Sequence, residues 1–130
     1  MQRRQRILVV EDEIHILEVY REFLGLKHDT TLTDNVSDAY EAMSNALEEG
    51  PRYDVVVVDR KLNGDDGDAL VKKMRKIGYD KPVIMVSGSE MPEDAYELDG
   101  KDEVPRGKGY MFLRKPIRFA YLGKVIDQMV

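Results

Sequence analysis

Short apolar runs alternate with longer amphipathic stretches along the whole chain, and this alternation narrows the folds that the sequence can adopt. The runs at 6–10, 54–58 and 82–86 are rich in β-branched residues and have the length of a typical strand. None of them alternates polar with apolar side chains, which is typical of strands buried on both faces of a parallel sheet. With weaker strands expected at 30–33 and 110–113, the pattern predicts a five-stranded parallel sheet.

The stretches between these runs have the apolar spacing of amphipathic helices. The i, i+3, i+4, i+7, i+8 pattern is complete over 39–47 and recurs over 70–77 and 122–129. A further helix is expected over 14–26, ending near a glycine. Strict alternation of strands and helices predicts an α/β fold in which helices cover both faces of the parallel sheet.

The length and composition of the chain limit its organisation. A chain of 130 residues has room for one core, so 1–130 is expected to be a single domain without an output domain. The net charge of −5 gives no general reason to expect nucleic-acid binding. No apolar run reaches the roughly 18 residues of a membrane span, and no signal-peptide pattern is present. The absence of Cys excludes disulfides, thiol catalysis and zinc–thiolate sites but does not fix the compartment. Because neither a membrane span nor a signal peptide is found, we expect a cytoplasmic protein.

Polar residues follow four of the expected strands. Acidic residues occupy 11–13 after the first strand, Asp59 follows the third, Ser87 the fourth and Lys115 the fifth. Ligands of such sheets bind beyond the carboxyl ends of the strands, so these side chains are expected to converge. Converging carboxylates favour a hard cation such as Mg²⁺, while a hydroxyl and an ammonium group can bind phosphoryl oxygens. A carboxylate is also a known nucleophile in the formation of aspartyl phosphate.

Each of these residues has a simpler explanation when it is taken alone. Asp12 would be a helix cap, Ser87 a turn residue and Lys115 a solvated surface charge. Asp59 is harder to explain in this way, because a carboxylate that ends an apolar strand is costly unless it is paired or bound to metal. The joint placement of all four types therefore predicts a phosphoryl-transfer site.

Four motifs carry a resemblance to a known family: ILVVEDE at 7–13, VVVVDRKLNGDDG at 55–67, PVIMVSGS at 82–89 and FLRKP at 112–116. In these motifs the sequence resembles the receiver domains of two-component response regulators over essentially its whole length. The resemblance implies the flavodoxin-like (βα)5 fold. It also implies a signalling switch rather than an enzyme, phosphorylated by a sensor histidine kinase or a histidine phosphotransfer protein and acting on an unknown protein target.

The resemblance also assigns roles to individual residues. It places the acidic Mg²⁺-binding pair at Glu11 and Asp12, the phospho-acceptor and further metal ligand at Asp59, and a third metal oxygen at the backbone carbonyl of Lys61. The expected metal ligands are therefore Glu11, Asp12, Asp59 and Lys61, and no other cofactor is expected.

The switch residues follow from the same resemblance. Ser87 is the expected switch hydroxyl, Lys115 the phosphate-binding lysine and Phe112 the switch aromatic. We expect the Phe112 ring to point outward without phosphate and inward with it. Because Lys115 must point back across the strand ends while the chain turns into the last helix, a cis peptide is expected at Lys115-Pro116.

The sequence departs from the family in two places. Arg60 and Asn63 stand in the loop after the acceptor, where the family usually has other residues, although Leu62 keeps an apolar contact and Asn63-Gly64 suits a tight turn. The second departure lies between Ser87 and Lys115, where the charged, glycine-rich segment 97–109 predicts that a fourth helix ends early.

Three other functions remain as alternatives. A Mg²⁺-dependent phosphatase would need a second acid two residues after Asp59, where this chain has Lys61. A flavin- or nucleotide-binding module would need a phosphate loop after the first strand, and the acidic segment 11–13 would repel phosphate. A receiver that is never phosphorylated would usually have lost a site residue.

His15 is expected at the helix surface and His28 in a solvated loop, both without a function.

Overall fold

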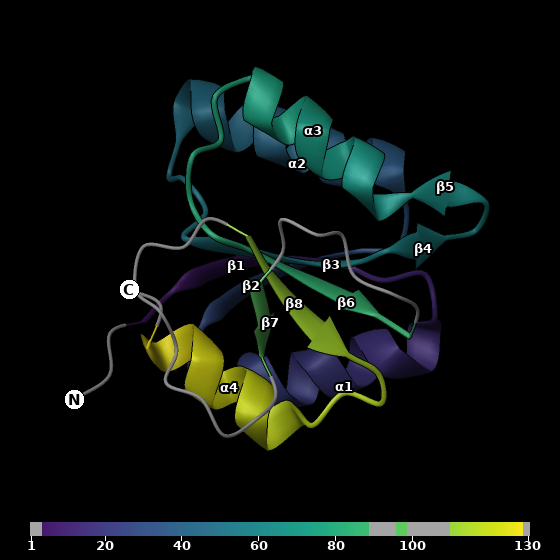
Figure 1. Ribbon diagram of the computed structural model, residues 1–130. Helices are drawn as coiled ribbons and strands as arrows, with labels where there is room; N and C mark the ends of the chain where they lie inside the picture. Colours follow the sequence, from purple (N-terminus) through teal and green to yellow (C-terminus); the bar gives the residue numbers. More distant parts are fainter. Residues whose placement is uncertain (1–3, 89–95, 99–109, 129–130) are drawn as a thin grey trace.

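A mostly parallel arrangement of strands forms the centre of the computed structural model, which describes residues 4–88, 96–98 and 110–128 (Figure 1). The strands of the main sheet lie in the order β2-β1-β3-β6-β8-β7, and every neighbouring pair is parallel. Their bounds are β1 (Arg6–Val10), β2 (Asp29–Thr33), β3 (Val55–Asp59), β6 (Val83–Ser87), β7 (Tyr96–Leu98) and β8 (Tyr110–Arg114). The five expected strands are thus confirmed, with small shifts at their ends.

Helices cover both faces of this sheet, as the sequence predicted (Figure 1). The pair α2 and α3 lies on one face, and the pair α1 and α4 lies on the other. Their bounds are α1 (Ile14–Leu24), α2 (Val36–Glu49), α3 (Gly67–Lys76) and α4 (Phe119–Gln128). The α/β fold with helices on both faces of a parallel sheet is therefore confirmed.

The central strand β3 explains why the apolar runs show no polar alternation. Val55 and Val57 belong to the core under α1 and α4, whereas Val56 and Val58 belong to the core under α2 and α3. Successive side chains of a strand point to opposite faces, so a sheet that is covered on both faces needs apolar residues at every position. All five residues of β3 are buried.

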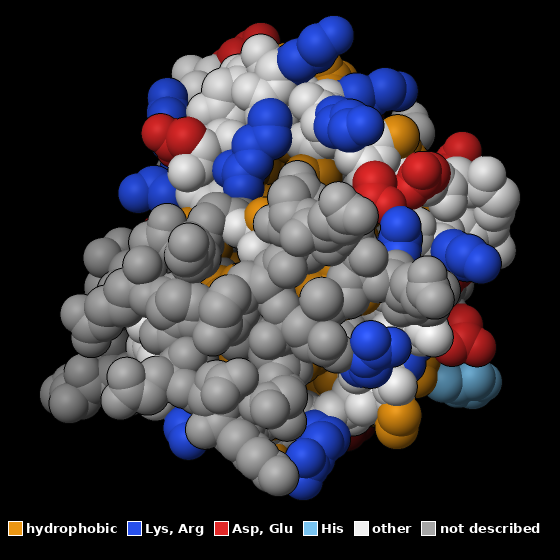
Figure 2. Space-filling view, viewed as in Figure 1, with side chains coloured by type: hydrophobic (Ala, Val, Ile, Leu, Met, Phe, Trp, Pro, Cys, Tyr) orange, Lys and Arg blue, Asp and Glu red, His pale blue; other side chains and the backbone are white. Residues whose placement is uncertain are grey.

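Capping residues set the helix ends. The Asn35 side chain accepts a hydrogen bond from the Asp38 backbone N–H, and this cap starts α2 before the apolar pattern begins. Asp66 caps α3 in the same way through the Asp68 N–H. The last turn of α3 is basic, which complements the helix dipole, and Figure 2 shows Lys and Arg side chains gathered over this helix.

A small hairpin follows β3. Its two strands, β4 (Lys61–Leu62) and β5 (Asp65–Asp66), pair antiparallel, and Leu62 is buried. The connecting residues Asn63 and Gly64 have φ of 48° and 87°, the left-handed values of a two-residue type I′ turn. The expected tight turn and the apolar contact of Leu62 are both present.

The short strand β7 was not expected. It pairs with β8 at the edge of the sheet, within the segment where the sequence predicted the end of a fourth helix. Apart from β7, the residues of that expected helix and most of the segment 97–109 lie outside the described residues. Backbone pairing with the exposed edge of β8 is a tertiary effect, and local sequence patterns do not report it.

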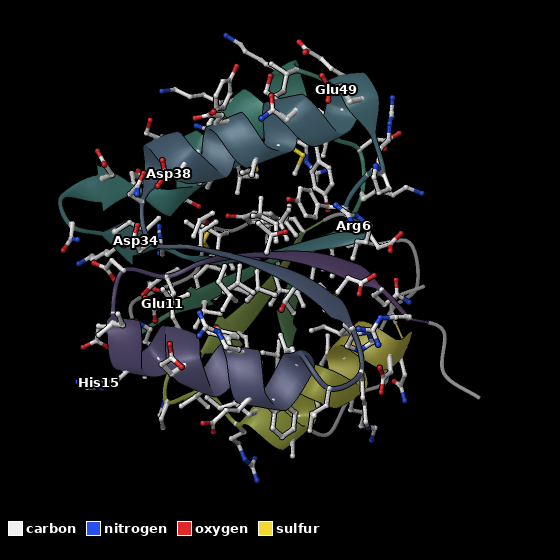
Figure 3. The ribbon with its side chains drawn as sticks, turned by 180° about the vertical axis from the view of Figure 1, so that it is seen from behind. Arg6, Glu11, His15, Asp34, Asp38 and Glu49 are labelled. Carbon is white, nitrogen blue, oxygen red and sulfur yellow. The ribbon has the colours of Figure 1, made fainter. Side chains whose placement is uncertain are left out.

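The two histidines have different environments. His15 is exposed and projects from the start of α1, as expected (Figure 3). The prediction of a solvated His28 was wrong, because this side chain is buried. Its Nδ1 accepts a hydrogen bond from the Gln5 N–H at 3.0 Å, and its Nε2 lies 3.2 Å from Asp127 Oδ1. Neither partner is close to His28 in sequence.

Among the described residues, no helix has the length and apolar character to cross a membrane.

Candidate functional site at the carboxyl edge of the sheet

Four adjacent strands bring the expected site residues to one edge of the sheet. Glu11 directly follows β1, Asp59 ends β3, Ser87 ends β6 and Lys115 directly follows β8. Because these strands are neighbours and all parallel, their carboxyl ends lie side by side. The structure therefore assembles in one place the side chains that the sequence scatters over more than a hundred positions.

Three carboxylates form the core of this site. Oxygen atoms of Glu11, Asp12 and Asp59 lie within 4.8 Å of one another. Glu11 and Asp59 are buried, whereas Asp12 is half-buried. The Oε2 atom of Glu11 is buried without a hydrogen-bond partner among the described residues. Such an oxygen is costly unless a cation binds it, and a set of carboxylate oxygens is what Mg²⁺ prefers. The residues present fit a Mg²⁺ ion.

The crowding of these carboxylates changes the protonation of Glu11. Burial raises the pKa of Glu11, and the adjacent Asp59 carboxylate raises it further, to about 8. The adjacent Asp12 carboxylate acts in the same direction, and the charge of Lys115 opposes it. At neutral pH the metal-free protein therefore holds a proton on Glu11, which a bound cation would displace.

Replacing Glu11 with Gln is expected to flatten the pH dependence of stability in the metal-free protein. The Glu11 pKa rises from an ordinary 4.5 to about 8 in the folded state, so between these values the folded state binds more protons than the unfolded state. Its stability contribution is complete below about pH 4.5 and is lost, by an amount on the order of a few kcal/mol, as the pH rises to about 8. Urea unfolding in EDTA across this range measures the effect.

The matched control is Glu13→Gln, because Glu13 is an exposed neighbour on the same segment. This variant should keep the decline of stability with pH that the unaltered protein shows. An equal decline in the Glu11→Gln protein would contradict the assignment of the raised pKa to Glu11.

Lys115 brings a positive charge to Asp59. Its Nζ donates a hydrogen bond to Asp59 Oδ2 at 2.8 Å. Burial opposes the charge of Lys115, but the hydrogen bond and charge of Asp59, with the charges of Glu11 and Glu13, outweigh burial and raise the Lys115 pKa. The peptide bond Lys115-Pro116 is cis, which confirms the expectation, and Gly50-Pro51 is a second cis bond that was not foreseen.

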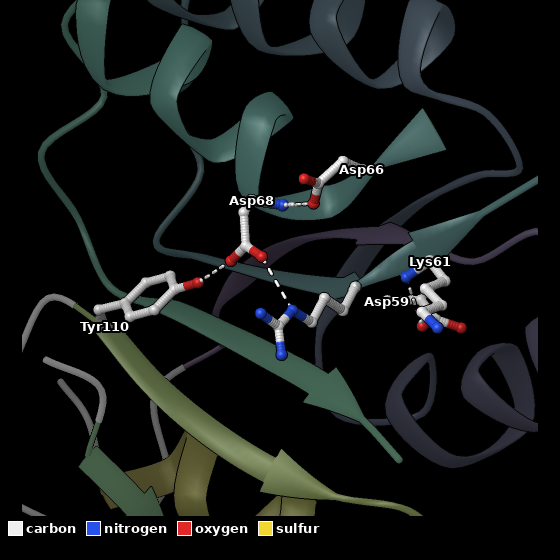
Figure 4. Close-up of polar contacts among 6 residues, drawn as sticks. Asp59, Lys61, Asp66, Asp68 and Tyr110 are labelled. Carbon is white, nitrogen blue, oxygen red and sulfur yellow. Dashed lines mark hydrogen bonds and ion pairs between the residues drawn. The ribbon is translucent and has the colours of Figure 1, made fainter. Parts of the chain in front are cut away.

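Backbone N–H groups of the hairpin hold two of the carboxylates. The Lys61 N–H donates to Asp59 Oδ1 at 3.2 Å (Figure 4), and the Asn63 N–H donates to Asp12 Oδ2 at 3.0 Å. The loop that departs from the family pattern thus contacts two of the three acidic residues. The role of the Lys61 carbonyl as a metal ligand stays a prediction.

Gly67 makes a close approach that the sequence did not reveal. A Cβ atom at this position would lie 2.4 Å from the Asp59 carbonyl oxygen and 3.0 Å from the Arg60 Cα. The Gly67 N–H also donates to the Arg60 carbonyl oxygen at 2.7 Å. The start of α3 therefore packs directly on the backbone of the expected acceptor. Hydrophobic periodicity holds no signal for this backbone contact.

The two expected switch residues are both buried. Ser87 is 3% exposed at the end of β6, beside β3 in the sheet. Phe112 is 0% exposed, so the outward ring expected without phosphate is not found in this structure. The ring lies in the core under α2 and α3, and the Arg60 guanidinium covers it at 5.8 Å from the ring centroid. Because Phe has no hydroxyl, burial leaves no polar group of its side chain without a partner.

Comparisons with known proteins identify the family. Residues 7–127 match the response regulator receiver domain. The two-component response regulator ORR41 of Oryza sativa subsp. japonica is 26% identical, and the match covers 93% of this chain and 91% of that protein. The transcriptional regulatory protein CutR of Streptomyces coelicolor is 30% identical over 92% of this chain, which spans 54% of CutR.

Solved structures agree on the fold. The receiver domain of the hybrid histidine kinase CckA matches with a TM-score of 0.72 and 26% identity, covering 95% of this chain and 97% of that one. The receiver domain of the sensor histidine kinase PA1611 from Pseudomonas aeruginosa PAO1 matches with a TM-score of 0.73, 22% identity and 98% coverage of both chains. That structure has a magnesium ion coordinated in its active-site cleft. The present chain belongs to the response regulator receiver domains, a family whose known role is phosphoryl acceptance on an aspartate.

Proposed function

We propose that Asp59 is the phospho-acceptor of this receiver domain and that its phosphorylation requires Mg²⁺. The observation that carries the proposal is the position of the Asp59 carboxylate between two acidic neighbours and the Lys115 ammonium, which lies 2.8 Å from Oδ2. The donor is a phosphohistidine on a sensor histidine kinase or a histidine phosphotransfer protein, and the output is a contact with a downstream protein. We place this exchange in the cytoplasm.

The chain's own residues perform distinct parts of the transfer. Glu11, Asp12, Asp59 and the Lys61 carbonyl would hold Mg²⁺, which offsets the repulsion between carboxylate and phosphoryl oxygens. An Asp59 oxygen forms a bond to phosphorus as the bond from phosphorus to the donor nitrogen breaks, and the imidazole leaves with that electron pair. Lys115 keeps a fixed positive charge beside the phosphoryl oxygens throughout the transfer.

The phosphorylated state is read out through Ser87 and Phe112 in this proposal. When Asp59 is phosphorylated, the Ser87 hydroxyl donates a hydrogen bond to a phosphoryl oxygen. This bond stabilises a position of Ser87 close to Asp59, and it exists only while the phosphoryl group is present. Phe112 lies on β8, the strand that pairs with β6. It stands two residues before Arg114, which is the partner of Ser87 in this register. Its buried ring in this structure suits the inward position that phosphorylation would favour.

The domain is not an ordinary turnover enzyme, and we propose that it catalyses only its own phosphoryl transfer and hydrolysis. In this proposal the donor approaches through a cleft of about 530 Å³ beside Glu11 and Lys115. Its walls come from the loop after β1, the start of α1 and the segment 115–119.

Incubation with acetyl phosphate and Mg²⁺ tests this function. The intact protein is expected to gain the mass of one phosphoryl group. EDTA is expected to abolish this gain, because without the metal the negative carboxylate and phosphoryl oxygens repel each other. A phosphatase would instead release phosphate continuously without lasting mass gain, and a receiver that is never phosphorylated would show neither change. Equal labelling with and without EDTA would contradict the metal dependence.

A further inference from the structure

The residue after the expected acceptor has a fixed backbone. The Arg60 N–H donates to the Val86 carbonyl oxygen at 2.9 Å, and its own carbonyl oxygen accepts from the Gly67 N–H at 2.7 Å. The first bond ties Arg60 to β6, and the second ties it to the start of α3. Because Arg60 is bonded covalently to Asp59, any shift of the acceptor backbone is passed to the Arg60 side chain.

The Arg60 side chain reaches the switch aromatic. Its guanidinium carbon lies 5.8 Å from the centroid of the Phe112 ring, within the range of a cation–π interaction. Its Nε donates to Asp68 Oδ2 at 2.9 Å, so the carboxylate fixes the direction of the planar group. The Arg60 side chain is only 26% exposed, which weakens the competition from water.

Asp68 connects Arg60 to β8, the strand that carries Phe112, through a second contact. Its other oxygen, Oδ1, accepts a hydrogen bond from the Tyr110 hydroxyl at 2.6 Å, as Figure 4 shows. Tyr110 begins β8 and lies on the same face of the strand as Phe112, two residues later. Asp68 stands in the first turn of α3, where the helix dipole favours a negative charge.

We propose that Arg60 is a positioning residue that holds the Phe112 ring in its buried position and couples it to the acceptor. The chain of contacts runs from Asp59 through Arg60 to Phe112, and through Asp68 to Tyr110 on the same strand. This inference rests on the proposed function, because it assigns Arg60 a part in the same switch.

Coupling of this kind is reciprocal. If the guanidinium stabilises the buried ring, and the buried ring favours the phosphorylated state, then loss of the guanidinium lowers the affinity for a phosphate mimic. The apparent affinity falls by the fraction of molecules that leave the buried state. Asp68 keeps its hydrogen bond from the Tyr110 hydroxyl when the guanidinium is removed, so the variant is expected to fold.

The test compares Arg60→Met with Arg75→Met. Met keeps an apolar stem and removes the guanidinium. Arg75 is a matched control because its guanidinium also lies over an aromatic ring, that of Tyr79 at 5.3 Å, and also donates hydrogen bonds, to the Tyr79 and Lys81 carbonyl oxygens. These contacts lie at the far end of α3 from the acceptor, and they involve Tyr79 and Lys81 rather than Asp68 or Phe112.

The first readout needs neither metal nor phosphate. The chain has three Phe residues, so fluorophenylalanine labelling gives three fluorine resonances, and Phe112→Leu identifies the one from Phe112. In the metal-free protein, Arg60→Met should move this resonance and increase its solvent isotope shift. Arg75→Met should leave both as they are in the unaltered protein. Tyr110→Phe, which removes only the hydroxyl, should act in the direction of Arg60→Met.

The second readout is the affinity for beryllium trifluoride in the presence of Mg²⁺. Arg60→Met is expected to lower it roughly two- to fivefold, the factor that a partly exposed cation–π contact supplies. An unchanged Phe112 resonance together with an unchanged affinity would overturn the proposal. If the unaltered protein failed to bind the mimic, the proposed function would be contradicted, and the metal-free fluorine readout would still decide on Arg60.

Discussion

Asp59→Asn is expected to abolish labelling by acetyl phosphate. An amide lacks the negative oxygen that attacks phosphorus, and the substitution also removes one carboxylate from the cluster that would bind the metal. No other described residue combines a buried carboxylate at the carboxyl edge of the sheet with a lysine ammonium at hydrogen-bond distance. The loss should therefore be complete within the sensitivity of intact-protein mass spectrometry.

The control for this substitution is Asp65→Asn. Asp65 lies on the neighbouring hairpin, is exposed and takes no part in the acidic cluster. It should be labelled like the unaltered protein. Circular dichroism should show that the Asp59→Asn protein folds, since the change relieves repulsion among close carboxylates. Undiminished labelling of a folded Asp59→Asn protein would contradict the assignment of Asp59 as the phospho-acceptor.

Gly67→Ala is expected to impair both stability and phosphorylation. The added methyl group would meet the Asp59 carbonyl oxygen at 2.4 Å, and that atom belongs to the backbone, so the start of α3 or the acceptor must shift. Overpacking of this kind costs about 1–3 kcal/mol. A displacement of a reacting group by about 1 Å can lower a rate by roughly 100-fold. Urea unfolding and the rate of labelling by acetyl phosphate measure the two effects.

Gly88→Ala separates this clash from a general effect of glycine replacement. Gly88 also follows a strand at the site edge, but among the residues that the structure describes a Cβ atom there would meet only the Lys115 side chain, at an ordinary 4.0 Å. This variant should keep near-normal stability and labelling. If Gly67→Ala behaved like Gly88→Ala in both measurements, the close packing of α3 on the acceptor backbone would have no functional weight.

The main part of the fold could be predicted because both faces of the sheet are covered. Runs such as 54–58 then need apolar side chains at every position, and the stretches between them need one apolar face. The location of the site followed from the same reasoning, since Asp59 and Ser87 stand where parallel strands end. These signals are local, and each can be read within a few residues.

Contacts between distant segments had no such signal. Gly67 packs on Asp59 through backbone atoms, and His28 is buried by bonds to Gln5 and Asp127 at opposite ends of the chain. The contact of Arg60 with Phe112 also depends on the register of β3, β6 and β8, which periodicity does not give. The buried position of the Phe112 ring could not be predicted for the same reason, because the Arg60 guanidinium that covers it comes from the end of another strand.

Chemical mapping of the phosphorylated residue tests the central claim most directly. Borohydride reduces an aspartyl phosphate to homoserine, which peptide sequencing by mass spectrometry locates without any substitution in the protein. After treatment with acetyl phosphate and Mg²⁺, we expect homoserine at position 59 and nowhere else, and none when EDTA is present. Homoserine at position 12, or a phosphoryl group recovered on His15 with Asp59 intact, would contradict the account.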